Sequence, residues 1–414
     1  MISFKKLAAA AASCSLAASM FGCSASIGNG TQKALSADGY DVRSGVFIYY
    51  TLQAYDEAVS VLSEQNNNET PTLKDVKGAH IDELDASEWI QDKATENCTA
   101  FAATKKEFDN IGGELSKEDL DQAAEMAEYY LAYDPRNEAN GVGIESMKEI
   151  AENTYKEQAI FEHYYGIDAP NGCSEDELKD YFDENFARVK YFSISLTDSE
   201  GNEMNEDDKR KMHQKAEEYA KKINKKSGDL EKMLEFDVVN EEYNDYVAAQ
   251  TTAAEGETPV ETTTTAVSTE TDESGKVVTT TTNPYEKERL MQKQTTTTAE
   301  ANADPTVTTA AETETSKQSR QFNEYVFNEL TEYKAEVYDY SPDTIYVVIK
   351  GDLRERMTED DYWTDDYKLQ LLQTRYYDEF IKMMEGIADK MSVEKNSASY
   401  RRYSPFKLEL ESSK

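Results

Sequence analysis

The chain has 414 residues, a formal net charge of −38 and an isoelectric point near 4.4. This length predicts two or three domains. The acidic balance argues against nucleic-acid binding, which needs clustered Lys and Arg to neutralise phosphates, and against electrostatic adhesion to an anionic lipid surface. We assign most of the charge to the solvation of helix surfaces.

Residues 1–22 have the layout of a secretory signal peptide: Lys5 and Lys6 precede a short, alanine-rich apolar run. The run is too short for a transmembrane span. The residues MFGC at 20–23 resemble a bacterial lipobox, which predicts lipidation of Cys23 and an anchored protein on the extracytoplasmic face of a bacterial cell membrane. The alternatives are an ordinary cleaved signal with an incidental cysteine, or lipidation at Cys14. Residues 23–45 are then expected to form a tether.

Residues 46–185 are expected to form a helical domain, because apolar residues recur there at helical spacing. A capping box at Ser174 and Glu177 opens its last short helix. Cys98 and Cys173 are expected to be two ordinary buried thiols, although export would permit a disulfide between them. The predicted helices of this domain cover residues 44–65, 86–111, 116–133 and 141–166.

The pattern then alternates over residues 187–196, which predicts a strand followed by two helices. Residues 247–318 are rich in Thr, Ala and Glu and poor in large apolar residues, so we expect disorder there, with glycosylation conceivable. A short helix near 321–330 and strands over 333–341 and 343–353 follow.

Neither one strand nor two strands alone make a stable sheet, so the Thr-rich tract is expected to interrupt one domain, whose halves are residues 186–246 and 319–355. Residues 356–414 are expected to return to the helical domain. They include a helix with an apolar stripe over 369–391, which fits packing on that domain or, alternatively, an adaptable groove for unfolded clients. The sequence therefore predicts an α+β protein.

No Ser/His/Asp, Cys/His or phosphate-loop arrangement is visible, so we expect no catalytic residues, metal ligands or cofactor. His163 and His213 lie in predicted helices, where packing or surface roles are expected rather than catalysis. Acid pairs at 207–208, 360–361 and 365–366 stand at predicted helix starts, where capping is favoured over calcium binding.

The order of these elements resembles an exported foldase lipoprotein of the PrsA/SurA-like kind, with a parvulin-type prolyl isomerase domain. The resemblance covers most of residues 45–410 and rests on the order of several weak pieces rather than on one motif. They are GVFIYY, EWIQDKA, GVGIESM with the helix ending HYYGI, ELKDYFDENFARVKYFSISL, VFNELTEYKAEVYDYSPDTIYVVIKGD and KNSASYRRYSP. The resemblance implies a helical chaperone-like domain completed by the C-terminal helix, and a small parvulin-like α/β domain.

The chain departs from an active parvulin at the positions that shape the proline pocket. The first strand reads YFSIS at 191–195, where the family pattern resembles ASHIL, and the last strand has Val347 where the pattern YHIIK has histidine. The family's Gly-rich segment is replaced by the Thr-rich tract. We therefore expect a membrane-anchored foldase or chaperone that binds unfolded or partly folded secreted proteins without isomerase catalysis. An active isomerase with an altered pocket and a surface scaffold or adhesion lipoprotein are the alternatives, and the oligomeric state is left open.

Overall fold

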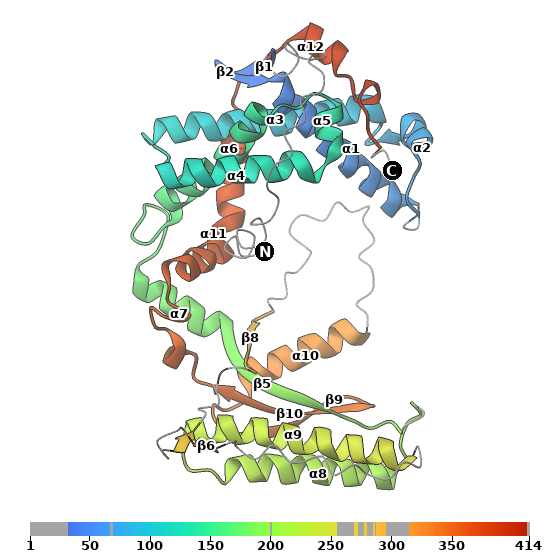
Figure 1. Cartoon of the computed structure of the whole chain (residues 1–414), viewed down its shortest axis with the longest axis vertical. Coiled ribbons are helices and arrows are strands. Elements are labelled where there is room, and N and C mark those ends of the chain that lie inside the picture. Colours follow the sequence, from blue (N-terminus) through green and yellow to red (C-terminus); the bar gives the residue numbers. More distant parts are fainter. Residues whose placement is uncertain are drawn as a thin grey trace. The chain divides into compact units, whose positions relative to one another are not determined.

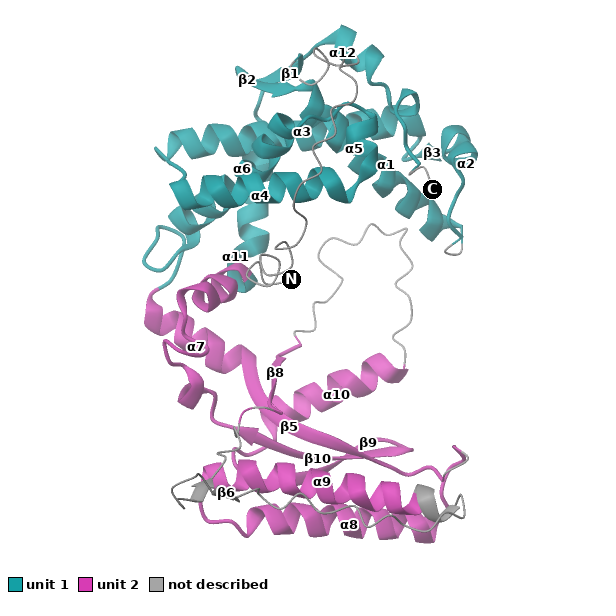
Figure 2. Ribbon diagram, viewed as in Figure 1, with its two compact units in different colours: residues 1–173, 374–414 teal, residues 174–373 magenta. Residues whose placement is uncertain are grey.

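The computed structural model describes residues 32–66, 69–198, 201–254, 269–271, 277–279, 285, 287–294 and 314–411. The described chain is an α+β protein, which confirms the predicted fold class. It divides into two compact units, shown in separate colours in Figure 2. The first unit contains residues up to 173 together with 374–414, and the second contains residues 174–373.

The first unit is a helical body built on one apolar core. Helices α1 (Ser44–Gln65) and α3 (Ala86–Asn110) place Phe47, Ile48, Ile90 and Phe101 in that core, each at most 2% exposed. Ser116 caps α4 (Lys117–Tyr133) in a reciprocal capping box with Asp119. The helices are α1 (Ser44–Gln65), α2 (Leu73–Gly78), α3 (Ala86–Asn110), α4 (Lys117–Tyr133), α5 (Pro135–Ala139), α6 (Ile144–Tyr165), α12 (Ser397–Arg402) and η3 (Pro405–Lys407), with short strands β3 (His80–Ile81) and β4 (Leu84–Asp85).

The expected tether over 23–45 is wrong for its second half. Strands β1 (Lys33–Ala37) and β2 (Tyr40–Arg43) form a hairpin, and β1 also pairs with β11 (Val393–Lys395). The turn residues Asp38 and Gly39 have φ of 48° and 88°, which suits the tight turns that favour Asp-Gly. Leu35 is fully buried, so apolar burial holds this stretch in the first unit.

The second unit is a four-stranded antiparallel sheet with helices on both faces, as Figure 1 shows. The strand order is β8-β5-β10-β9. Helices α8 and α9 cover one face, and α10 covers part of the other. The elements are α7 (Glu175–Asn185), β5 (Phe186–Ser195), α8 (Glu206–Asn224), α9 (Asp229–Ala254), β8 (Arg289–Gln292), α10 (Glu314–Asn328), β9 (Glu336–Ser341), β10 (Thr344–Gly351) and η2 (Leu353–Arg356), beside a separate pair β6 (Thr269–Thr271) and β7 (Val277–Thr279).

Strand β5 contributes apolar side chains to both faces of the sheet, because helices cover both faces. Val189 and Tyr191 lie on the α10 side, whereas Ile194 and Leu196 pack against α8 and α9. This explains why the apolar positions change parity along the sequence of the strand.

The expected disorder over 247–318 fails at four places in the described chain. Helix α9 continues to Ala254, β6 pairs with β7, β8 pairs with β5 from within the tract, and α10 begins at Glu314. Most of the remaining tract lies outside the described residues. The boundaries between the two units also fall at 173/174 and 373/374 rather than at the expected 185/186 and 355/356.

Helix α11 (Asp365–Ala388) carries the apolar stripe predicted over 369–391. Its C-terminal part packs within the first unit: the Phe380 ring lies 5.4 Å from Phe161, and Ile387 contacts the core. Packing therefore accounts for this part of the stripe. Cys98 and Cys173 are buried free thiols, which confirms that prediction.

Candidate functional site

The resemblance noted in the sequence would place the two pocket histidines of a parvulin on β5 and β10. In the observed register Phe192 lies opposite Val347, and Ser193 lies opposite Tyr346. Val347 is fully buried against α8 and α9, whereas Ser193 is exposed on the other face. None of these side chains ordinarily titrates near neutral pH, so these positions offer no general acid or base.

Four half-buried tyrosines line the α10 side of the sheet: Tyr191, Tyr338, Tyr340 and Tyr346, which we call the tyrosine face. Phe322 of α10 lies among them, with ring centroids 5.2 Å from Tyr191 and Tyr338 and 5.0 Å from Tyr346. Burial raises the pKa of Tyr346 to about 12, so its hydroxyl stays protonated. Ring area combined with hydroxyl groups suits peptide binding better than proton transfer.

Strand β8 borders the tyrosine face and is held at both of its ends. Arg289 stacks on Tyr191, with the guanidinium carbon 4.6 Å from the ring centre, and its Nη1 donates to the Tyr191 hydroxyl at 2.7 Å. Asn323 of α10, 4% exposed, donates to the Gln292 carbonyl and accepts from the Gln294 amide, both at 2.8 Å. These contacts fix a strand that the Thr-rich composition around it does not predict.

A buried carboxylate anchors the N-terminal side of β8. The Glu288 side chain is 0% exposed and lies between Arg356, whose Nη1 is 3.0 Å from its Oε2, and Arg188, whose Nη1 is 3.9 Å away. We call these three residues the arginine pocket. The pKa of Arg188 is raised: burial, the largest single effect, acts to lower the pKa, and Glu288, Tyr333 and Glu355 together outweigh it.

Arg188 is a functional candidate that sequence analysis missed. It is 1% exposed on β5, and its Nη2 donates to Glu355 at 2.6 Å and to the Tyr333 hydroxyl at 2.8 Å. Gly351 lies opposite Arg188, and a Cβ there would come within 2.4 Å of Nε. The signal in the sequence that could have identified Arg188 is a charged residue that alternates with apolar residues in a strand covered on both faces.

Two cavities of the second unit are lined by residues that the structure describes. The first, about 340 Å³, includes Lys350, whose pKa is lowered by burial, and Glu332, whose pKa is raised by burial. Lys350 donates to the Val326 carbonyl at 3.1 Å. The part of this lining that the structure describes holds no Ser, Cys or His side chain.

The second cavity, about 450 Å³, is lined in part by His213 and Tyr340. His213 Nδ1 lies 3.6 Å from the Asp339 carboxylate on β9. His163 stands on α6 and its ring contacts Tyr164 edge-on. The three histidines are thus dispersed, since His80 pairs with Asp85 in the first unit.

The other predicted sites divide as follows. Cys23 lies outside the described residues. Asp207 and Asp208 stand in the first turn of α8, where both amides donate to the capping side chain of Asn205, as the capping interpretation expects. Asp361 accepts from Arg356 instead. Across the residues that the structure describes, no group of His, Cys, Asp and Glu has the geometry to hold a metal ion.

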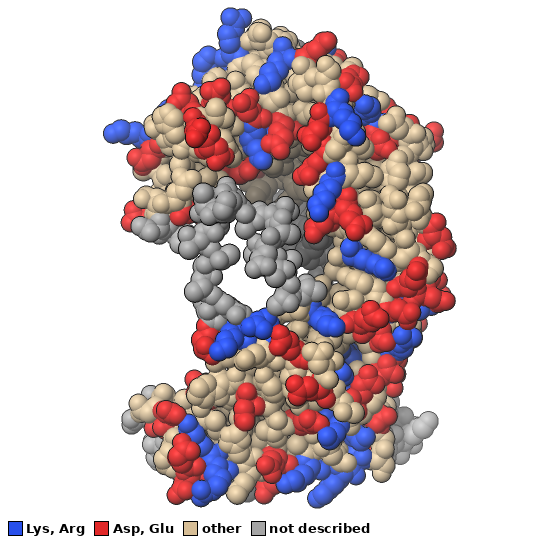
Figure 3. Space-filling model, turned by 180° about the vertical axis from the view of Figure 1, so that it is seen from behind, with Lys and Arg blue, Asp and Glu red and all other residues tan. Residues whose placement is uncertain are grey.

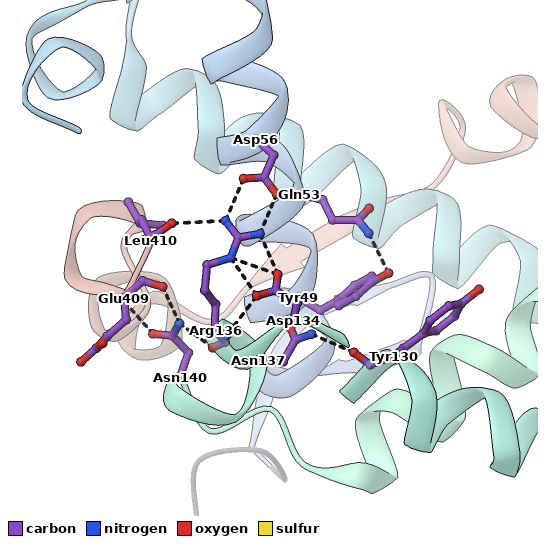
Figure 4. Close-up of polar contacts among 10 residues, drawn as sticks. All are labelled: Tyr49, Gln53, Asp56, Tyr130, Asp134, Arg136, Asn137, Asn140, Glu409 and Leu410. Carbon is purple, nitrogen blue, oxygen red and sulfur yellow. Dashed lines mark hydrogen bonds and ion pairs between the residues drawn. The ribbon is translucent and has the colours of Figure 1, made fainter. Parts of the chain in front are cut away.

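In the first unit, a polar cluster fastens the C-terminal tail, as Figure 4 shows. Arg136 forms a bidentate pair with Asp56 of α1 at 2.7 Å, and its Nη2 lies 2.6 Å from Asp134. Its Nη1 also donates to the Leu410 carbonyl at 3.2 Å, and Asn140 exchanges two hydrogen bonds with the backbone of Glu409. Since every group of Arg136 is directed to these partners, the cluster is structural.

On the described part of the face in Figure 3, Lys and Arg side chains are interspersed with Asp and Glu. None of the described helices is both long and apolar enough to cross a bilayer. Comparison of the chain with protein-family models, curated proteins and solved structures finds no match.

Proposed function

We propose that this protein is a lipid-anchored extracytoplasmic foldase-like chaperone that holds unfolded or partly folded secreted proteins without isomerising proline bonds. Its first unit would act as the client-binding body. Its second unit would be a parvulin-like module that binds or scaffolds. Cys23 would carry the lipid.

The observation that carries the proposal is the second unit's chain order together with its strand positions. The order β5-α8-α9, then α10, β9 and β10 agrees with the arrangement on which the parvulin resemblance rests, and β8 is an additional strand from within the Thr-rich tract. At the two places where an active parvulin has histidine, the chain has Ser193 and Val347. A site that stabilises a twisted imide needs groups that this arrangement lacks in the described chain.

The half-buried aromatic surfaces support a binding role. The tyrosine face presents rings and hydroxyls, and aromatic side chains bind peptides with little loss of conformational entropy. The return of residues 374–414 to the first unit also agrees with the resemblance.

Two assays on the mature chain test the proposal. The first measures aggregation of a reduced secretory protein, which we expect the chain to slow at near-stoichiometric amounts. The second measures a proline-limited refolding phase, which takes tens of seconds uncatalysed and which we expect to stay unchanged at catalytic amounts of the chain. Failure to slow the aggregation of any unfolded client would overturn the chaperone function, and accelerated refolding would establish the isomerase alternative.

The anchor is tested separately by fractionation. We expect Cys23→Ala to shift the protein from the membrane fraction to the soluble fraction, with Cys14→Ala as the matched control. An unchanged membrane fraction in Cys23→Ala would refute lipidation at that residue.

A further inference from the structure

Helix α4 carries a row of side chains that face solvent. Glu125, Tyr129 and Tyr133 are spaced by four residues and so lie on the same side of the helix. Tyr129 is 50% exposed and Tyr133 is 75% exposed, and their ring centroids lie 5.7 Å apart.

Two half-buried tyrosines extend this row toward α1. Tyr130 contacts Tyr129 at 6.0 Å, and Tyr49 lies near Tyr130, as Figure 4 shows. Burial is the main cause that raises the pKa of Tyr49, and the nearby Tyr130 adds to it, so the Tyr49 side chain stays neutral. We call Tyr49, Glu125, Tyr129, Tyr130 and Tyr133 the α4 strip.

The surroundings of the α4 strip are acidic, and the cations of α4 and α5 are already engaged. Lys117 pairs with Asp121 at 3.3 Å, and Arg136 is held by two carboxylates. Glu125 and Glu128 make no hydrogen bond or ion pair with another residue that the structure describes. The acidic residues of α4 are Glu118, Asp119, Asp121, Glu125 and Glu128.

We propose that the α4 strip binds basic, extended segments of unfolded polypeptides. Lys or Arg side chains would lie over the rings of Tyr129 and Tyr133, with Glu125 and Glu128 balancing their charge. This inference rests on the proposed chaperone function and names the class of client segment that the first unit selects. An acidic segment would meet repulsion at the same surface.

The spacing of the strip also fits an extended chain. Four residues along a helix rise about 6 Å. Alternate residues of an extended chain, whose side chains point the same way, are about 6.6 Å apart. A segment with a basic residue at every second position therefore places successive cations over Tyr129 and Tyr133.

The test uses a fluorescein-labelled peptide in which Lys alternates with Ser over twelve residues, and a charge-reversed peptide with Glu at the Lys positions. Their binding to the full mature chain is followed by fluorescence anisotropy. We expect the Lys peptide to bind more tightly than the Glu peptide. We also expect the binding of the Lys peptide to weaken as added salt shortens the screening length.

Two double variants remove the two kinds of contact. In Tyr129→Ser/Tyr133→Ser, loss of two cation–π contacts should weaken binding of the Lys peptide about fivefold to thirtyfold. Glu125→Gln/Glu128→Gln should weaken it and reduce its salt dependence. The matched controls lie in the second unit. Leu230→Ser, at a side chain that is 53% exposed, replaces an exposed apolar residue, and Glu359→Gln/Asp360→Asn removes two exposed charges. Both controls should leave binding of the Lys peptide unchanged. Unchanged circular dichroism of each variant verifies that it folds.

The outcomes separate this inference from the proposed function. If the chain slows client aggregation but the strip variants bind the Lys peptide like the controls, the α4 strip proposal is wrong and the chaperone function stands. Equal binding of the Lys and Glu peptides also overturns it. If the strip variants lose the Lys peptide while no client is protected, the strip is a basic-peptide site and the chaperone function is wrong.

Discussion

The arginine pocket predicts a large effect from a small substitution. In Glu288→Gln the side-chain shape is kept and only the charge is removed. Breaking a buried ion pair from one side typically costs about 3–5 kcal/mol, because the partner charge stays buried without compensation. In this variant Arg188 retains its ion pair with Glu355, and Arg356 retains its ion pair with Asp361. We therefore expect the free energy of unfolding of the second unit to fall by about 3 kcal/mol, at the lower end of that range.

The assay is urea unfolding of the mature chain, combined with hydrogen exchange of peptides that contain β5 and β8, which assigns the loss to the second unit. Glu241→Gln is the matched control. Glu241 also pairs with a residue of the β8 segment, Lys287, at 3.1 Å, but the two side chains are 61% and 44% exposed. Exposed pairs contribute little, so the control should lose less than about 0.5 kcal/mol. Equal effects of the two substitutions would refute the argument that burial makes Glu288 the anchor of β8.

Three further predictions concern single residues. Asn323→Leu removes both side-chain hydrogen bonds to the backbone of Gln292 and Gln294 and should lower the free energy of unfolding by about 1–3 kcal/mol. Amide exchange over 289–294, measured by mass spectrometry, should become faster. Unchanged exchange would contradict the role of Asn323 in holding β8. Gly351→Ala places a Cβ against the Arg188 guanidinium and should lower the free energy of unfolding, measured in urea, by about 1–3 kcal/mol. Gly386→Ala, in open space on α11, should not lower it. Burial raises the pKa of Glu157 above its ordinary value of 4.5, so the charged form of this side chain opposes folding at pH 7. Glu157→Gln should therefore raise the thermal midpoint at pH 7 by about 2–4 °C. This gain in the midpoint should shrink as the pH falls through the raised pKa and should vanish below pH 4.5. A gain that persists at pH 4 would exclude the desolvated carboxylate as its cause.

Helical periodicity was sufficient to predict the four long helices α1, α3, α4 and α6 of the first unit and the β-α-α order of β5, α8 and α9, but not the short helices α2, α5 and α12. Long amphipathic patterns report burial directly, because one face must be covered. The hairpin at 33–43 was missed although Asp38-Gly39 is a strong turn signal, since its strands are short and their small residues resemble a linker.

Strand β8 had no local signal that sequence analysis can use. Its four residues lack a full period of alternation, and they become a strand because β5 offers an unpaired edge and Asn323 and the arginine pocket hold the ends. A deletion of residues 250–316, which an all-disordered tract would tolerate, therefore removes a strand of the sheet. Arg188 was missed for a related reason: its partners come from residues 288, 333 and 355, far along the chain.

The pairing of β1 with β11 has a consequence for the order in which parts of the first unit become available during synthesis. Residues 33–37 are made well before their partner strand, which ends at Lys395. The sheet of the second unit likewise waits for β10, which reaches Gly351. Neither unit can close while the chain is still arriving, and long-range pairing is slow and exposes apolar surface meanwhile. While it is being synthesised, this protein is therefore itself an incomplete chain with exposed apolar surface, of the kind that it is proposed to bind.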